Sequence, residues 1–433
     1  MAVPAKLRAA KTATAETLLG RHQRPATASG WAEAARDGAQ SRLLAMGGPA
    51  ARDEYWRYTN PQLLTSETAE AKAFAVEEVA VFDEVDALRL VFVDGGFRAD
   101  LSDDPAMDGV EITSLADVLA TDIHWAKDIF GVLEAAGQDP VERPLAALNT
   151  AMAEAGFVIR VTGKPARPIN LRYLHQNPTS DAIIRHLIRV EAGAEVTILE
   201  NGPAAARFNK AMEVDIADDG ICHHVRAQGR DHDRLAATAM FARLGARSAF
   251  KSFTLTVNGR LTRNETVIEF TGDDAVGHIA GAAIGEGDFS HDDTVFVTHD
   301  AVGCESRQVF KKVLKDGAKG VFQGKILVRK DAQKTDGYQI SQGLLLSDNA
   351  EFLAKPELEI YADDVACSHG STCGAVDETV LFYLRSRGVP EAEAKDMMVI
   401  AFVDDAVQEI DDEAVADVIR NRIEAWLARR SAA

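Results

Sequence analysis

The chain has 433 residues, and its 46% of hydrophobic side chains is enough to build a large buried core. The 47 Lys and Arg residues are outnumbered by 67 Asp and Glu residues; the resulting net charge of −20 argues against binding to nucleic acid or to an anionic membrane. No apolar run reaches the roughly 18 residues that a membrane-spanning helix needs. Four cysteines without a C-x-x-C pair are too few for a disulfide framework and predict a reducing, cytoplasmic location.

Residues 1–156 are predicted to form a mostly helical N-terminal region. Ala, Glu, Arg and Leu dominate it, and a helical pattern covers roughly residues 114–154. A short strand, Leu88–Val93, is expected to end at the turn Asp94-Gly-Gly96. The aromatic cluster Glu54-Tyr-Trp-Arg-Tyr-Thr59 is interpreted as a packing anchor.

Residues 157–373 are predicted to form a β-rich core. No proline occurs between Pro203 and Pro356, as expected for a continuous sheet of mostly interior strands, because proline cannot donate a ladder hydrogen bond. A sandwich, a barrel and a β-solenoid are all open, and the lack of a clean hairpin series makes an irregular β-helix plausible. Short β-rich runs separated by turn residues recur at Phe157–Val161, Val196–Leu199, Phe253–Val257, Thr266–Phe270, Thr294–Thr298, Val321-Phe322 and Lys325–Val328.

Residues 374–433 are predicted to be helical again. Asp377 can cap a helix that carries Val380, Leu381 and Leu384 on one face. Arg385, Arg387 and Gly388 are typical of the end of that helix, and a second helix after Pro390 carries Met397 and Met398 in an apolar stripe. Such a stripe is usually core, although methionine surfaces also adapt to partners. A last helix carries Val415, Val418, Ile419, Ile423 and Trp426.

Two of the four cysteines surround a histidine in the segment Cys367-Ser-His369-Gly-Ser-Thr-Cys373. Side chains alternate between the two faces of a strand, so an unbroken strand would place Cys367, His369 and Cys373 on the same face. Thiolate and imidazole are suitable ligands for iron and zinc. The C-x-H-x3-C spacing is not a standard closed zinc pattern, and spacing alone favours cysteines that simply pack as small hydrophobic residues.

Other candidate motifs are weaker. The glycine-rich segment Gly320–Lys325 lacks the spacing and hydroxyl of a phosphate-binding loop, and Gly370–Gly374 has Thr372 where a nucleophile elbow needs serine. His278, His291 and His299 lie within one short stretch and could bind a metal only if they converge in space. Polar residues at solenoid turns are the favoured interpretation of these histidines.

Several longer motifs resemble the SufB/SufD family of iron–sulfur cluster assembly proteins. The Cys-Ser-His-Gly signature and the absence of an N-terminal C-x-x-C-x-x-x-C cluster favour the SufD branch of this family. The resemblance spans nearly the whole chain and is specific after about residue 245. The matching segments are Ser306–Phe310, Lys334–Gly337, Leu344–Ser347, Lys355–Gly370 and Phe382–Gly388.

This resemblance implies a right-handed parallel β-helix core, residues 157–373, between helical N- and C-terminal regions. It implies a non-catalytic scaffold that pairs with SufB as a heterodimer and receives sulfur through SufB. For the isolated chain, a homodimer and a monomer both stay open. A transient iron–sulfur cluster shared with SufB is expected at His369 and Cys367, with Cys373 a tentative further ligand, and no permanent cofactor. The SufC ATPase is expected to dock on the C-terminal helices, through Val380, Leu384, Arg385, Arg387, Met397 and Met398.

Two alternatives belong to other functional classes. A metal-dependent or hydrolytic β-helix enzyme could use the His278/His291/His299 cluster or Thr372. Carbohydrate-active β-helices usually display aromatic platforms, and the aromatic content of only 6% weakens that option. A structural adaptor would instead use Cys367 and His369 only for packing.

Overall fold

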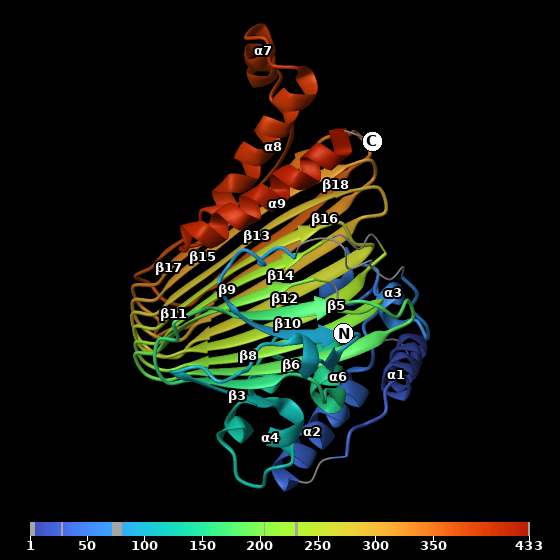
Figure 1. The fold of residues 1–433 in the computed structure, drawn as a ribbon, viewed down its shortest axis with the longest axis vertical. Coiled ribbons are helices and arrows are strands. Elements are labelled where there is room, and N and C mark those ends of the chain that lie inside the picture. The colour runs from blue at the N-terminus through green and yellow to red at the C-terminus, as the bar shows by residue number, and fades with distance from the viewer. Residues whose placement is uncertain (1–4, 27–28, 72–79, 203, 230–232, 432–433) are drawn as a thin grey trace.

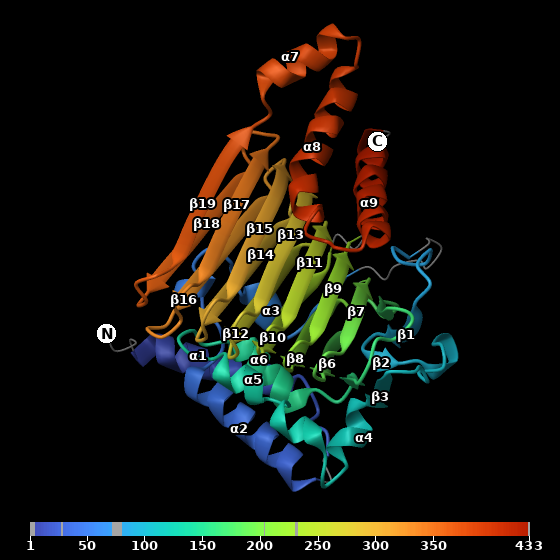
Figure 2. The same ribbon diagram turned by 90° about the vertical axis from the view of Figure 1, so that its left-hand side faces the viewer.

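Figure 1 shows the computed structural model of the chain, which describes residues 5–26, 29–71, 80–202, 204–229 and 233–431. Its centre is a parallel β-solenoid in which successive strands alternate between two facing sheets (Figures 1 and 2). Within the described residues, one sheet has ten strands and is called sheet A; the other has nine and is called sheet B. The predicted parallel β-helix between helical ends is therefore confirmed.

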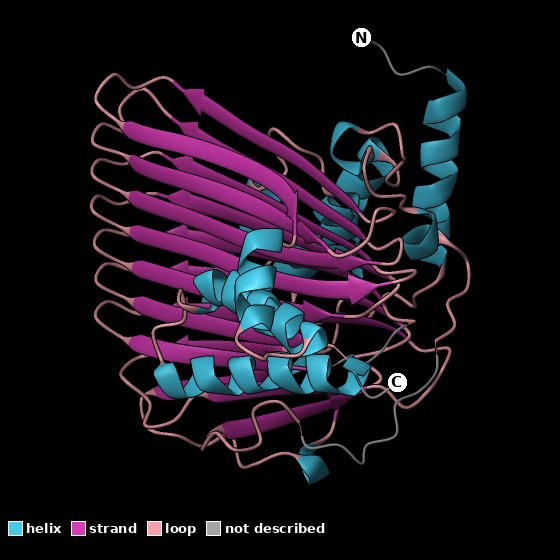
Figure 3. Cartoon of the chain, turned by 90° about the horizontal axis from the view of Figure 1, so that it is seen from above, coloured by secondary structure: helices cyan, strands magenta, loops and turns pink. Residues whose placement is uncertain are grey.

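Sheet A consists of β1 (Leu88–Val93), β2 (Gly96–Phe97), β5 (Ile169–Leu174), β7 (Glu195–Asn201), β9 (Ile221–Gln228), β11 (Ala249–Val257), β13 (Val276–Glu286), β15 (Glu305–Lys315), β17 (Asp336–Leu345) and β19 (Ala366–Ala375). Sheet B consists of β3 (Val110–Ser114), β4 (Phe157–Val161), β6 (Asp181–Val190), β8 (Arg207–Ile216), β10 (Leu235–Leu244), β12 (Leu261–Phe270), β14 (Ser290–His299), β16 (Lys319–Val328) and β18 (Glu351–Ile360). Figure 3 shows the strands stacked edge to edge with tight turns along one side. Apart from β1–β2 and β3–β4, these neighbours run parallel.

The β-rich runs seen in the sequence all lie inside strands, and Leu88–Val93 forms β1. Because β1 and β3 belong to the two sheets, the sheets begin before residue 157. The helical pattern over residues 114–154 breaks into three short helices, α4 (Leu115–Leu119), α5 (Val132–Ala136) and α6 (Pro144–Met152). One break lies at Gly131, whose φ of +71° is a conformation that glycine adopts without strain.

The N-terminal helices cover the outer face of sheet B (Figure 2). They are α1 (Ala5–Gly20), α2 (Gly30–Met46), α3 (Gln62–Thr65) and the three short helices above. Leu43, Trp56 and Leu148 pack against Leu235 and Leu261 of β10 and β12. The solenoid thus has one face sealed by the first third of the chain.

The C-terminal helices cover the outer face of sheet A only in part. α8 (Glu391–Val407) and α9 (Glu413–Ser431) bury Val403, Ile419 and Trp426 against Phe253 and Val309 on the outer face of sheet A. In contrast, α7 (Glu378–Ser386) projects away from the solenoid, as Figures 1 and 2 both show. None of the described helices is long and apolar enough to cross a membrane.

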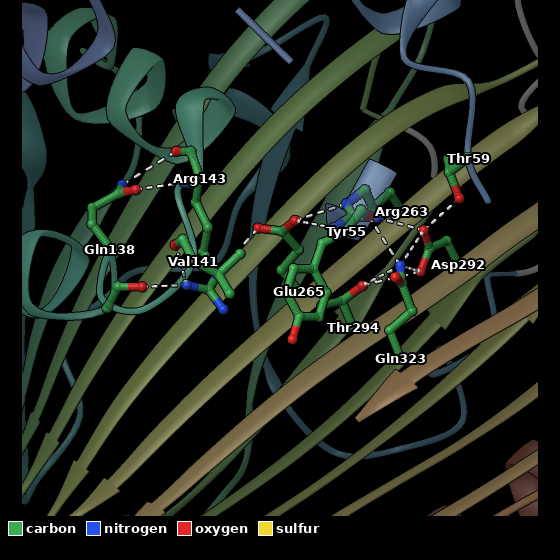
Figure 4. A network of polar contacts seen from close by, with 11 residues as sticks. Tyr55, Thr59, Gln138, Val141, Arg143, Arg263, Glu265, Asp292, Thr294 and Gln323 are labelled. Carbon is green, nitrogen blue, oxygen red and sulfur yellow. Dashed lines mark hydrogen bonds and ion pairs between the residues drawn. The ribbon is translucent and has the colours of Figure 1, made fainter. Parts of the chain in front are cut away.

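A buried ionic network fastens the aromatic cluster Glu54–Thr59 to the outer face of sheet B (Figure 4). The Arg263 guanidinium lies 4.1 Å from the centre of the Trp56 ring and donates to the Tyr55 carbonyl at 2.9 Å. Arg263 also forms an ion pair with Asp292, which accepts from the Thr59 hydroxyl. The network makes this cluster the packing anchor that the sequence predicts.

Replacing Asp292 with alanine should lower the free energy of unfolding by about 2–3 kcal/mol, because buried Arg263 would keep only Glu265 as a counter-ion and the buried Thr59 hydroxyl would lose its acceptor. Urea unfolding followed by circular dichroism measures this loss. The matched control is Asp215→Ala, which removes a more exposed ion pair with Arg243 on the same sheet and should cost about 1 kcal/mol or less. Equal losses in the two variants would contradict the anchoring role of Asp292.

Candidate functional site

The candidate site lies at the open end of the solenoid, where both sheets stop. Among the strands that the structure describes, β19 is the last of sheet A and pairs only with β17, and β18 is the last of sheet B and pairs only with β16. Most residues of β19 are exposed, whereas β18 is half-buried along most of its length. Unpaired strand edges of this kind are templates for pairing with another chain. Pro356 lies in β18, where an edge strand tolerates the missing N–H group.

β19 carries the cysteine–histidine signature as one unbroken strand. Cys367, His369 and Cys373 pair in register with Gly337, Gln339 and Gly343 of β17. This face is the solenoid interior, because Gln339 and Ser341 are buried there. The Ser371 hydroxyl, on the same face, lies 2.7 Å from that of Ser341. The predicted arrangement of Cys367, His369 and Cys373 on one face is therefore confirmed.

The three potential ligands differ in their surroundings. Cys367 is half-buried against Ile326 and Leu358, whereas His369 and Cys373 are exposed. Partial desolvation raises the pKa of the Cys367 thiol and that of the Cys373 thiol, so both are protonated near neutral pH. A metal or a nearby cation would have to displace these protons before either sulfur could bind.

The part of the chain that the structure describes contains no group of three or more His, Cys, Asp or Glu side chains suited to holding a metal ion. Cys367 and His369 are two residues apart on one exposed edge, so groups from another chain could approach them. The open end can therefore supply part of a ligand set on a surface that can pair with a second protein.

The three histidines of the alternative metal site do not converge in the structure. His278 lies on the outer face of sheet A, where its Nε2 is 3.0 Å from Glu305 and its Nδ1 is 3.3 Å from Glu409. His291 and His299 lie in the solenoid interior at opposite ends of β14, about 26 Å apart at the usual rise per residue. The alternative metal site built on these three residues is wrong, because the register assigns them to separate surroundings.

The two interior histidines have structural partners. The Lys312 ammonium lies 2.8 Å from Nδ1 of His291 and 2.7 Å from Asp293. Burial lowers the pKa of His291 to about 3 and that of His299 to about 4, so both rings are neutral. The His299 ring stacks on Phe270, and its Nε2 lies 2.8 Å from the Ser306 hydroxyl.

Thr372 is not positioned as a nucleophile. It lies on the outer face of β19, where its hydroxyl accepts a 3.0 Å hydrogen bond from the Gln342 side chain. No strand-to-helix elbow presents it, because β19 continues to Ala375.

The second candidate surface is α7. Asp377 caps this helix as predicted, accepting from the backbone N–H groups of Thr379 at 2.8 Å and Val380 at 3.2 Å. Leu381 is buried, but Phe382 and Tyr383 are 73% and 53% exposed. These two aromatics are absent from the predicted docking residues, although the unbroken apolar run Val380–Leu384 indicates that one helix face cannot bury them all.

The predicted docking residues are mostly accessible. Val380, Arg385, Arg387 and Met397 are exposed, and Leu384 and Met398 are half-buried. The Arg387 guanidinium lies 3.7 Å from the centre of the Tyr383 ring. Together with Phe382 and Tyr383, these residues form an apolar and basic surface on α7 and the first turns of α8, called here the α7 surface.

The sequence of the chain is similar to those of iron–sulfur cluster assembly proteins. Residues 173–402 match the family model described as SUF system FeS cluster assembly, SufBD core domain. The chain is 29% identical to the iron–sulfur cluster assembly protein SufD of Escherichia coli over 395 residues, which are 88% of this chain and 90% of that protein. It is 29% identical to SufD of Bacillus subtilis over 295 residues, covering 65% and 67% of the two chains. It is 26% identical to the chloroplastic protein ABCI7 of Arabidopsis thaliana, covering 90% and 85%. The chain belongs to the SufBD family of iron–sulfur cluster assembly proteins.

Proposed function

We propose that this chain is a SufD-type scaffold subunit, without catalytic activity of its own, that builds iron–sulfur clusters together with SufB and the SufC ATPase in the cytoplasm. The observation that carries the proposal is the exposed strand β19, which places Cys367 and His369 on one face of an edge able to pair with another chain. Membership of an iron–sulfur assembly family supports it.

In this proposal, SufB closes the open end of the solenoid through the free edges of β18 and β19. Backbone N–H and C=O groups along these edges then gain partners, and the half-buried β18 becomes interior. An isolated chain has the same unsatisfied edges, so a homodimer is the expected state without SufB. The sulfur donor acts through SufB.

The nascent cluster is the cargo of the site rather than a resident cofactor. His369 offers one imidazole, Cys367 offers one thiol, and SufB supplies the remaining ligands. A cluster held in this mixed way by two chains can leave more easily than one held by four thiolates of a single chain. Cys373 lies four residues beyond His369 on the same face and is a tentative further ligand.

SufC docks on the α7 surface in this proposal. Exposed aromatics next to arginines are the residue types that dominate protein interfaces. Movement of α7 would reach the solenoid through α8, whose C-terminal end is tied to sheet A. Lys311 pairs with Asp405 at 2.7 Å, and Lys251 pairs with Asp411, in the turn after α8, at 2.8 Å. Closure of the ATPase can therefore act on the sheet that holds His369.

Co-purification of the tagged chain with co-expressed SufB and SufC, followed by mass photometry, tests the assembly. We expect a complex with one copy each of SufB and this chain and two copies of SufC. The chain expressed alone is the control and should appear as a homodimer. Recovery of only the homodimer or a monomer from the co-expression would overturn the proposal.

A further inference from the structure

A pair of buried glutamine side chains lies directly beneath His369 in the solenoid interior. Gln308 of β15, Gln339 of β17 and His369 of β19 occupy successive positions in the parallel register. Both glutamines are 0% exposed, and the Gln339 amide nitrogen donates to the Gln308 side-chain oxygen at 2.9 Å. The three side chains therefore form one column that ends at the open edge.

The direction of this hydrogen bond leaves the Gln339 side-chain oxygen for another donor. Gln308 of β15 engages the nitrogen, and the neighbour in register on the other side of Gln339 is His369 of β19. Among the described residues this buried oxygen has no hydrogen-bond partner, and neither has the amide nitrogen of Gln308. The His369 ring would have to turn toward the oxygen in order to donate to it. A buried acceptor without a partner is unfavourable, so such an atom requires an explanation.

On the opposite sheet, a glycine and a phenylalanine of β16 border the Gln339 amide. The Gln339 amide lies against Gly324 of β16, where an added Cβ would come within 2.3 Å of its nitrogen and 2.7 Å of Cδ. The ring of Phe322 borders the same space. Glycine at position 324 thus makes room for the amide, and the neighbour in register that carries a ring N–H is His369.

We propose that Gln339 is a positioning residue for His369: its Oε1 accepts a hydrogen bond from one ring N–H and thereby fixes the tautomer. The other ring nitrogen then presents its lone pair to the cargo. Ligating histidines commonly use their second nitrogen in this way. The part that concerns the cargo rests on the proposed function, whereas the hydrogen bond itself does not.

The chemistry of an amide suits a temporary ligand. A carboxylate acceptor would make the imidazole more basic and strengthen its bond to a metal. A neutral amide orients the ring without adding charge, so His369 can be aimed while its hold on the cargo stays weak enough for release.

Nitrogen-15 NMR of the full chain with labelled histidine tests the hydrogen bond, at a pH roughly two units above the ordinary histidine pKa. Loss of the signal in His369→Ala identifies the His369 resonances. We expect one dominant tautomer in the wild type, seen as two well-separated ring nitrogen shifts. Gln339→Met removes the acceptor, so the two shifts should move toward each other. Gln339→Glu keeps an acceptor and should again give one dominant tautomer, with two well-separated ring nitrogen shifts.

Ser341→Ala is the matched control. Ser341 and Ser371 lie on the same two strands, two residues beyond Gln339 and His369 on the interior face, and the substitution removes their 2.7 Å contact. It should leave the His369 shifts unchanged. Unchanged shifts in Gln339→Met would overturn the inference, as would equal changes in Ser341→Ala. Cluster yield of the SufB–SufC complex with Gln339→Met is a separate readout and should fall less than with His369→Ala. If His369→Ala has no effect on yield, the proposed function fails while the NMR result still decides the hydrogen bond.

Discussion

Replacement of His369 by alanine is expected to lower iron–sulfur cluster yield roughly tenfold or more, because the loss of even an outer-shell partner of a metal ligand weakens a site by about 10- to 100-fold. The side chain is exposed and its strand position requires only the backbone, so folding should be unaffected. Reconstitution of the purified complex with iron and sulfide, followed by the visible absorption of the cluster, measures the yield.

Ser368→Ala is the control for this experiment, since Ser368 neighbours His369 on the opposite, outward face of β19. Both variants should co-purify with SufB and SufC in wild-type amounts. Normal cluster yield in His369→Ala would refute a role for the histidine. Loss of the complex itself would show that His369 contributes to assembly rather than to cargo binding.

The second large effect is expected at the α7 surface. Truncating a buried aromatic at the centre of an interface often removes about 2 kcal/mol or more, equivalent to roughly 30-fold in affinity. Phe382→Ala with Tyr383→Ala should therefore reduce SufC binding by at least this factor, as measured by calorimetry. The two side chains are the most exposed aromatics of α7, so the unbound chain should keep its stability.

Ile123→Ala is the matched control, because Ile123 is 86% exposed but lies in the N-terminal region. The affinity of this variant for SufC should equal that of the wild type. Unchanged affinity in the double α7 variant would show that SufC docks on another surface. Deletion of everything after Asp377 is a poor alternative. It would uncover the apolar outer face of sheet A, which α8 and α9 bury with Val403, Ile419 and Trp426.

The β-strands of the core could be predicted from the sequence because strand formation depends on local backbone geometry. Alternation within β19 places Cys367 and His369 on the same face whatever the rest of the fold does. The cap at Asp377 is equally local, since its side chain reaches N–H groups only two and three residues away. Which side of the helix lies against protein, and so why Leu381 is buried while Phe382 is not, could not be read in this way.

The sequence by itself therefore determined the family signature, the β-rich core and the shared face of the β19 signature. Only the tertiary structure decided which residues become neighbours across coils. Gln308 and Gln339 are 31 residues apart, and their side chains meet because the length of one coil brings them into register. His278, His291 and His299 are close in sequence but separated in space. The turn between β13 and β14 places His278 in sheet A and the other two in sheet B, and His291 and His299 lie at opposite ends of β14. Coil length and turn placement are set by packing between whole strands, which no short sequence pattern specifies.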